Sequence, residues 1–313
     1  MQFIPVLEFA LCYALFALST YAALSTGILS LAAGAFGAVA GFMSVHLLDL
    51  GLPFLLVVLC GVVIGAAVSV VVSLPILRLE SHYLALATLA LVLITRVFVL
   101  NVTALTGGAA GMVVSRTVST WELVLIVALA AWMFARLRRS RYGLAADTVR
   151  QDANVAAGLG VNVTQVRRTA MALSGGLAGA GGVMLANVLG YIGPDSYYIH
   201  LSFTMLAAVV LGGAFHWAGP IVGAVIFTML PELLRQFLSH GEAIANGIIL
   251  ILIMIFLPRG LVDPVRFKHW RNRARRGKDD DLGQPVLNAG KGSPRDAVTL
   301  PFLIIGRKRG GGE

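Results

Sequence analysis

The chain has 313 residues, of which 58% are hydrophobic and only 12% are charged, and its mean hydropathy is +0.86. Soluble domains carry about 25% charged residues, so this composition excludes a soluble body and indicates a membrane protein. The net charge of +9 does not indicate nucleic-acid binding, because the arginines gather in two blocks that flank apolar runs, where membrane topology needs them.

Apolar runs of about 18 residues or more recur along the chain and predict an all-α fold, a polytopic bundle of about eight to nine transmembrane helices. Only helices and closed barrels satisfy the backbone in lipid, and unbroken runs of this length exclude a barrel. The first run, residues 4–24, lacks the basic start of a secretory signal, so we expect a retained helix. A turn over Gly27–Leu31 separates it from a run of small residues over 32–43.

Two glycines in this second run, Gly37 and Gly41, are four residues apart. Small residues at this spacing let two helices approach closely in lipid, so a helix contact is one interpretation. The other interpretation is a broken helix that lines a transport pathway. We therefore keep both glycines as candidate pathway residues.

The next predicted helices cover residues 52–76 and 84–100, and the second carries Arg96. A charged side chain inside a membrane helix is costly. Arg96 therefore either snorkels or pairs with another helix, or it lines the pathway and meets a substrate carboxylate. A polar loop over 101–120 follows, in which the glycines of Thr106–Gly111 allow positive φ angles.

Predicted helices over 121–134 and 169–189 enclose a polar, arginine-rich segment. Three more helices follow, one from 200 to 212, one ending near 237 and one over 244–257. Because Lys and Arg accumulate in cytoplasmic loops, we expect this segment and the basic C-terminal tail in the cytoplasm. Counting the predicted helices back from these two regions puts Arg78 on the cytoplasmic side of the membrane, and puts the N-terminus and the 106–111 loop on the opposite side.

The expected domain organisation follows from this topology. A transmembrane domain covers 1–264 and contains a cytoplasmic loop over 136–167. Residues 265–313 form a basic juxtamembrane segment, which attracts anionic membrane lipid, and a disordered tail rich in Gly, Pro and Lys.

No catalytic, metal-binding or cofactor-binding pattern stands out, so we expect neither enzyme activity nor a cofactor. The nearest approach to an ATP-binding loop is Gly290–Ser293, which lacks the first glycine and the final Ser or Thr of the motif. Both cysteines, Cys12 and Cys60, lie in apolar runs, so neither a disulfide nor a metal site is expected.

Several motifs along the chain occur together in one known family. The strongest is Ser140-Arg141-Tyr142-Gly143, followed by Arg150, Ala156, Leu159–Asn162 and a glycine-rich helix. The supporting motifs are Arg78-Leu79 with Tyr83–Ala85 and Thr88-Leu89, Leu105–Gly108, Val210–Gly213 with Gly219-Pro220, and Phe256–Leu261. Over about Tyr21 to Pro264 the chain resembles the membrane permeases of branched-chain amino acid ABC importers, the LivM/LivH family, and is closer to LivM. It departs from the family at Leu93 and Ala153, where acidic residues are usual.

The resemblance implies the ABC importer permease fold in a multi-pass protein of the bacterial inner membrane. It implies three kinds of protein partner: a second, LivH-like permease, two cytoplasmic ATP-binding subunits of the LivG/LivF type, and a periplasmic substrate-binding protein. Substrate would pass between the permeases by alternating access while the partner subunits hydrolyse ATP. The candidate pathway residues are Arg96, Thr88, Gly37 and Gly41.

In the family, the arginine-rich loop looks like the segment whose short helix docks on the ATPase. Asp147–Gly158 is alanine-rich and predicts one short helix, with Asp147 and Asp152 in its first turns and Gly158 and Gly160 ending it. Its small residues would seat in a groove of the ATPase, and Arg150 would pair with an acidic rim. The expected coupling residues are Gly143, Arg150, Asp152, Ala153, Ala156, Ala157, Gly158 and Gly160. The alternative is a solvated loop whose arginines only set the topology.

Two other function classes stay open. A self-contained secondary transporter or channel needs membrane-buried ionisable groups, and the predicted helices offer little beyond Arg96. The other class is a membrane scaffold without transport. For a permease, branched-chain amino acids, other amino acids, urea and small carboxylates all fit these features as substrates.

Overall fold

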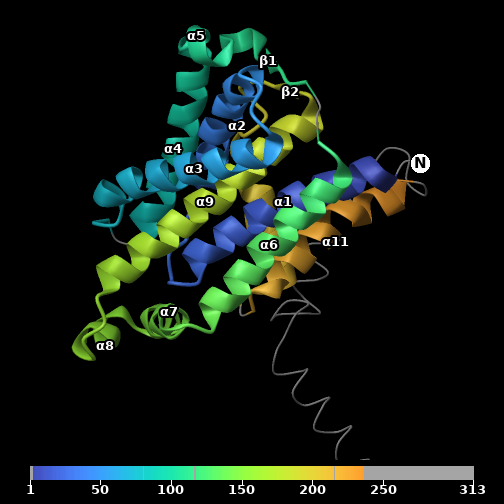
Figure 1. The fold of residues 1–313 in the computed structure, drawn as a ribbon. Coiled ribbons are helices and arrows are strands. Elements are labelled where there is room, and N and C mark those ends of the chain that lie inside the picture. The colour runs from blue at the N-terminus through green and yellow to red at the C-terminus, as the bar shows by residue number, and fades with distance from the viewer. Residues whose placement is uncertain (1–2, 80, 116–117, 215, 236–313) are drawn as a thin grey trace, which may run out of the picture. The chain divides into compact units, whose positions relative to one another are not determined.

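The structure is a computed structural model that describes residues 3–79, 81–115, 118–214 and 216–235. Helices dominate it (Figure 1). The elements in chain order are α1 (Phe3–Leu24), α2 (Ala33–Asp49), α3 (Phe54–Ile76), α4 (Ser81–Asn101), α5 (Thr103–Thr106), the 3-10 turn η1 (Gly108–Ala110), β1 (Met112–Val113), α6 (Thr120–Arg138), α7 (Arg141–Gln151), α8 (Ala153–Gly158), α9 (Val163–Leu189), β2 (Tyr191–Ile192), α10 (Ile199–Gly212) and α11 (Ala218–Arg235). The all-α prediction is confirmed.

Within the described residues, 5 helices are long and apolar enough to cross a membrane, namely α1, α3, α4, α6 and α9. Three shorter apolar helices, α2, α10 and α11, accompany them. These eight helices correspond to the first eight predicted runs. The ninth predicted helix, 244–257, and the predicted tail over 265–313 lie outside the described residues.

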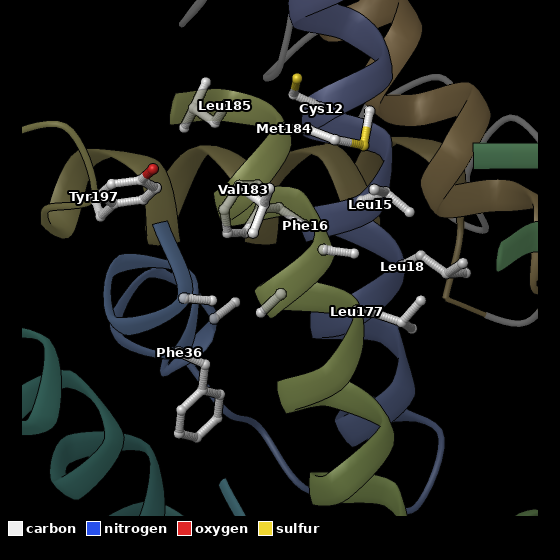
Figure 2. Close-up of a cluster of buried hydrophobic side chains, with 14 of the residues drawn as sticks. Cys12, Leu15, Phe16, Leu18, Phe36, Leu177, Val183, Met184, Leu185 and Tyr197 are labelled. Carbon is white, nitrogen blue, oxygen red and sulfur yellow. The ribbon is translucent and has the colours of Figure 1, made fainter. Parts of the chain in front are cut away.

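The buried centre of the fold is formed by α1 and α9, which are mostly enclosed by protein, whereas α3, α4 and α6 expose most of their apolar surface. Figure 2 shows side chains from α1, α2 and α9 meeting in this centre, with Tyr197 reaching in from the segment before α10. The Tyr197 hydroxyl donates to the carbonyl of Gly182 at 2.8 Å. Apolar outer surfaces on α3, α4 and α6 are what lipid or another membrane subunit requires.

Glycines and serines bring α3 and α9 into close contact. A methyl group on Gly175 would overlap the carbonyl of Gly65 and the side chain of Ser69. The Ser69 hydroxyl donates to the carbonyl of Met171 at 2.7 Å. In lipid, helices associate through this combination of small residues and interhelical hydrogen bonds.

The two predicted sides of the membrane correspond to two ends of the described bundle (Figure 1). One end carries α7 and α8. The other carries α5, η1 and the antiparallel pair of β1 and β2, in which Met112 lies opposite Ile192. The beginning of α1 lies at this second end, because Thr120 donates to Glu8 at 2.7 Å. Gly107, Gly108 and Gly111 there have φ angles of 70°, 62° and 65°, which confirms the prediction of positive φ.

Candidate coupling site and transport pathway

The arginine-rich loop folds into two short helices rather than one. Asp152 lies between α7 and α8 with extended backbone angles of φ −155° and ψ 115°. Its Oδ1 accepts hydrogen bonds from the backbone N–H of Asn154 at 2.8 Å and of Val155 at 3.1 Å. The prediction of a single helix over 147–158 is therefore wrong. An aspartate that caps a new helix ends the previous one, because its side chain satisfies N–H groups that otherwise lack partners.

A small apolar core holds α7 and α8 against the start of α9. Ala146, Val149, Ala156 and Val166 are buried together, and Tyr142 packs beside them. Ala156 is fully buried, so it does not belong to an outward docking face as predicted. A helix as short as α8 buries one face, and Ala156 occupies it, which leaves Ala157 exposed and Ala153 partly exposed.

The predicted stop at the end of this unit is confirmed. The structure ends α8 at Gly158, and Gly160 has a φ of 83°, in the left-handed region that glycine adopts freely. Among the described residues, no heavy atom outside the local chain lies within 4 Å of a methyl group built on Gly158.

Three large apolar side chains that the sequence reasoning missed project from this polar unit. Leu144, Val155 and Leu159 are 69%, 57% and 73% exposed. Exposed apolar patches mark protein contacts, and these three side chains are the candidates for such a patch on this polar unit. The sequence shows that these residues are apolar, but only the structure shows that the small core does not use them.

Two contacts fasten α7 to the end of α6. A methyl group on Gly143 would overlap the backbone of Arg138, so this predicted coupling residue acts through close packing. Arg138 Nη2 also donates to Asp147 Oδ1 at 2.7 Å, and the Arg138 side chain is only 14% exposed. Asp147 lies in the middle of α7, so it is not in the first turn of a helix, as the sequence predicted. Burial raises the pKa of the Tyr142 phenol in the same region.

Arg150 turns inward from the last turn of α7. Its Nη1 donates to the carbonyl of Ala214, 64 residues away in the connection between α10 and α11, at 2.7 Å. This guanidinium group thus bonds within its own chain, and the predicted pairing of Arg150 with an acidic rim of a partner stays a prediction. Burial, and secondarily the charge of Arg138, lower the pKa of His216 in the same connection.

Three of the four candidate pathway residues lie in packed contacts. The Thr88 hydroxyl accepts a hydrogen bond from Leu31 N at 3.1 Å and donates to Ala85 O at 2.8 Å. It thereby satisfies the non-helical backbone between α1 and α2. Methyl groups on Gly37 and Gly41 would meet Phe16 and Tyr197 respectively, so both glycines serve close helix packing.

The fourth candidate, Arg96, forms a salt bridge with Asp195 at 2.9 Å. Its guanidinium carbon lies 4.4 Å from the centre of the Tyr198 ring. The Arg96 side chain is 37% exposed and that of Asp195 is 73% exposed. Arg96 Nε is buried and has no hydrogen-bond partner among the described residues. The structure pairs Arg96 with the turn before α10 rather than with another helix, at a surface that is still accessible, and the pathway role of Arg96 stays a prediction.

Comparison with known proteins decides the family. Residues 3–257 match the model of the branched-chain amino acid transport system / permease component family. The chain belongs to this family. Its membership of this permease family and its apolar helices show that the chain is a multi-pass membrane protein.

Two types of branched-chain permease are among the relatives of this family member. It is 29% identical over 278 residues to the high-affinity branched-chain amino acid transport system permease protein LivM of Salmonella typhimurium, covering 77% of this chain and 65% of the relative. It is 29% identical over 145 residues to LivH of Escherichia coli K12, covering 45% of this chain and 46% of the relative. The greater coverage confirms the similarity to LivM.

A third relative is named for a different cargo. The autoinducer 2 import system permease protein LsrC of Escherichia coli O9:H4 is 30% identical over 145 residues, which cover 44% of this chain and 41% of the relative. The chain thus spans 65% of the length of the LivM relative and less of the others. No solved structure matches the chain.

Proposed function

We propose that this chain is the membrane-spanning permease subunit of an ATP-binding cassette importer. It moves branched-chain amino acids, or a related small polar solute, across the bacterial inner membrane by alternating access. The observation that carries this proposal is the family match over residues 3–257. The LivM and LivH relatives support branched-chain amino acids as the substrate, and the LsrC relative supports another small polar solute as the alternative.

The proposed assembly contains a second, LivH-like permease, two cytoplasmic ATP-binding subunits of the LivG/LivF type and a periplasmic substrate-binding protein. ATP is hydrolysed by the partner subunits. The exposed apolar surfaces of α3, α4 and α6 meet lipid or the second permease. The C-terminus is cytoplasmic, on the side of α7 and α8, because both regions are rich in arginine.

In this proposal α7 and α8 form the surface that docks on the ATPase. Leu144, Val155 and Leu159 supply the apolar contact, and Ala153 and Ala157 let the short helix seat closely. Buried apolar anchors carry most of the binding energy of protein interfaces. The polar surroundings keep the surface soluble until the subunits meet.

Arg96 is proposed to line the pathway. A salt bridge exposed to this extent is unstable against hydrocarbon, so its face of α4 meets water or another subunit. A substrate carboxylate resembles the side chain of Asp195 and can replace it on the guanidinium group. This supports a zwitterionic or anionic solute.

The test is association with the ATPase. The chain and its partner permease, reconstituted in nanodiscs, are titrated with the ATPase subunits. Leu159→Gln should weaken the association about tenfold, the order expected when an interface loses one buried apolar anchor. Leu50→Gln is the matched control, because Leu50 is 77% exposed and lies after α2, at the end away from α7.

The association measurement, combined with an uptake assay, distinguishes the proposed importer from a secondary transporter or channel. Association with the ATPase, together with ATP-dependent uptake of radiolabelled leucine, isoleucine and valine into proteoliposomes, supports the proposal. A secondary transporter or channel would move solute without the ATPase, driven by a proton or sodium gradient. Lack of any association with the ATPase would overturn the proposal.

A further inference from the structure

The end of α7 is in contact with two other parts of the bundle. Arg150 Nη1 donates to Ala214 O at 2.7 Å, between α10 and α11. A methyl group on Gly27, just after α1, would lie 3.6 Å from Arg150 Cα and 3.9 Å from Arg150 O. The segment that we propose to dock on the ATPase therefore rests on the inner ends of α1, α10 and α11 (Figure 1).

The α10–α11 connection belongs to a hairpin that is packed too tightly to bend within itself. A methyl group on Gly212 would overlap the carbonyl of Gly219, and one on Gly223 would overlap the carbonyl of Ala208. Backbone contact of this kind leaves two helices no room to approach or slide without a clash, which favours their moving together. A displacement applied at Ala214 therefore moves α10 and α11 as one body.

This junction also contains buried polar atoms without a partner. Tyr21 Oη, at the inner end of α1, and Arg138 Nη1, at the end of α6, have no hydrogen-bond partner among the described residues. Among the described residues, the other terminal nitrogen, Arg138 Nη2, donates to Asp147. Unpaired buried donors raise the free energy of this arrangement. A movement of α7 relative to α1 and α6 that gave these atoms partners would lower that free energy.

From these contacts we propose that Arg150 is a positioning residue that transmits movement of α7 and α8 to the α10–α11 hairpin. The inference rests on the proposed function, since it needs an ATPase that moves α7. Its distinct claim is that Arg150 couples ATP hydrolysis to transport without contributing to the affinity for the ATPase. A residue of the docking surface would change that affinity.

The test uses the complete complex in proteoliposomes, with the partner permease, the ATPase subunits and the binding protein. Three quantities are measured: ATPase affinity, stimulation of ATP hydrolysis by the binding protein, and leucine uptake per ATP hydrolysed. Arg150→Met should keep the affinity within twofold of wild type and lower uptake per ATP at least tenfold. Arg150→Lys should recover part of the loss, because a lysine also donates to a carbonyl. Where wild type does not carry leucine, the stimulation of hydrolysis by the binding protein takes the place of uptake.

Arg168→Met is the matched control, since it removes an exposed arginine near the start of α9 and should change none of these quantities. A parallel loss of affinity and uptake in Arg150→Met would assign Arg150 to the docking surface and overturn the inference. Unchanged uptake per ATP would also overturn it, as would loss of membrane insertion in both Arg150 variants. Failure of the wild-type chain to bind the ATPase would instead refute the proposed function.

Discussion

Replacing Asp152 tests whether the cap between α7 and α8 shapes the docking surface. Asp152→Ala removes both hydrogen bonds at the start of α8, those from Asn154 N and Val155 N. Loss of an N-cap costs about 1 kcal/mol. Because α8 has only 6 residues, it has no further hydrogen-bonded turns that could offset that loss. At 25 °C this corresponds to roughly a fivefold shift away from the folded α8.

The shift should appear in two measurements. Amide hydrogen exchange over residues 153–158 should accelerate about fivefold, and the affinity for the ATPase should fall by up to the same factor, because Val155 and Leu159 lose their fixed positions. Asp152→Asn is the matched control, since its amide oxygen still caps the helix while its charge is gone. Unchanged exchange in Asp152→Ala would refute the reasoning. An Asn variant as defective as the Ala variant would show that the charge matters and the cap does not.

Two further predictions concern the membrane region. Arg96→Gln should lower leucine uptake at least tenfold without impairing assembly of the complex, and Arg96→Lys should retain part of the activity because it keeps the charge. Failure of Arg96→Gln to assemble, or normal uptake, would contradict the pathway role. Gly175→Ala should destabilise the detergent-solubilised protein by about 1–3 kcal/mol, since its methyl group overlaps Gly65 and Ser69. Gly158→Ala, whose methyl group meets nothing within 4 Å in the described part of the chain, should not lower the melting temperature, and an equal loss in both variants would disprove the close-packing argument.

The candidate site was predictable in its location and only partly in its geometry. The arginine-rich segment, its glycine stop at Gly160 and its position between two membrane helices follow from local patterns. The orientation of its side chains does not. Ala156 and Ala157 are neighbours of the same type, yet one is buried and the other exposed, because Ala156 packs in the small core with Val149 and Val166. Sequence reasoning took the alanines as the contact and overlooked Leu144, Val155 and Leu159, which project outward.

By itself the sequence determined the membrane class, the all-α fold, the order of the helices and the family. Lipid imposes helical structure on every apolar run independently, since each run must satisfy its own backbone, and the family follows from local motifs. Only the tertiary structure decided the partners of the polar groups: Asp195 for Arg96, Leu31 for Thr88 and Ala214 for Arg150. Each of these bonds joins segments far apart in the chain. Their geometry depends on how the helices pack, which no local pattern of residues records.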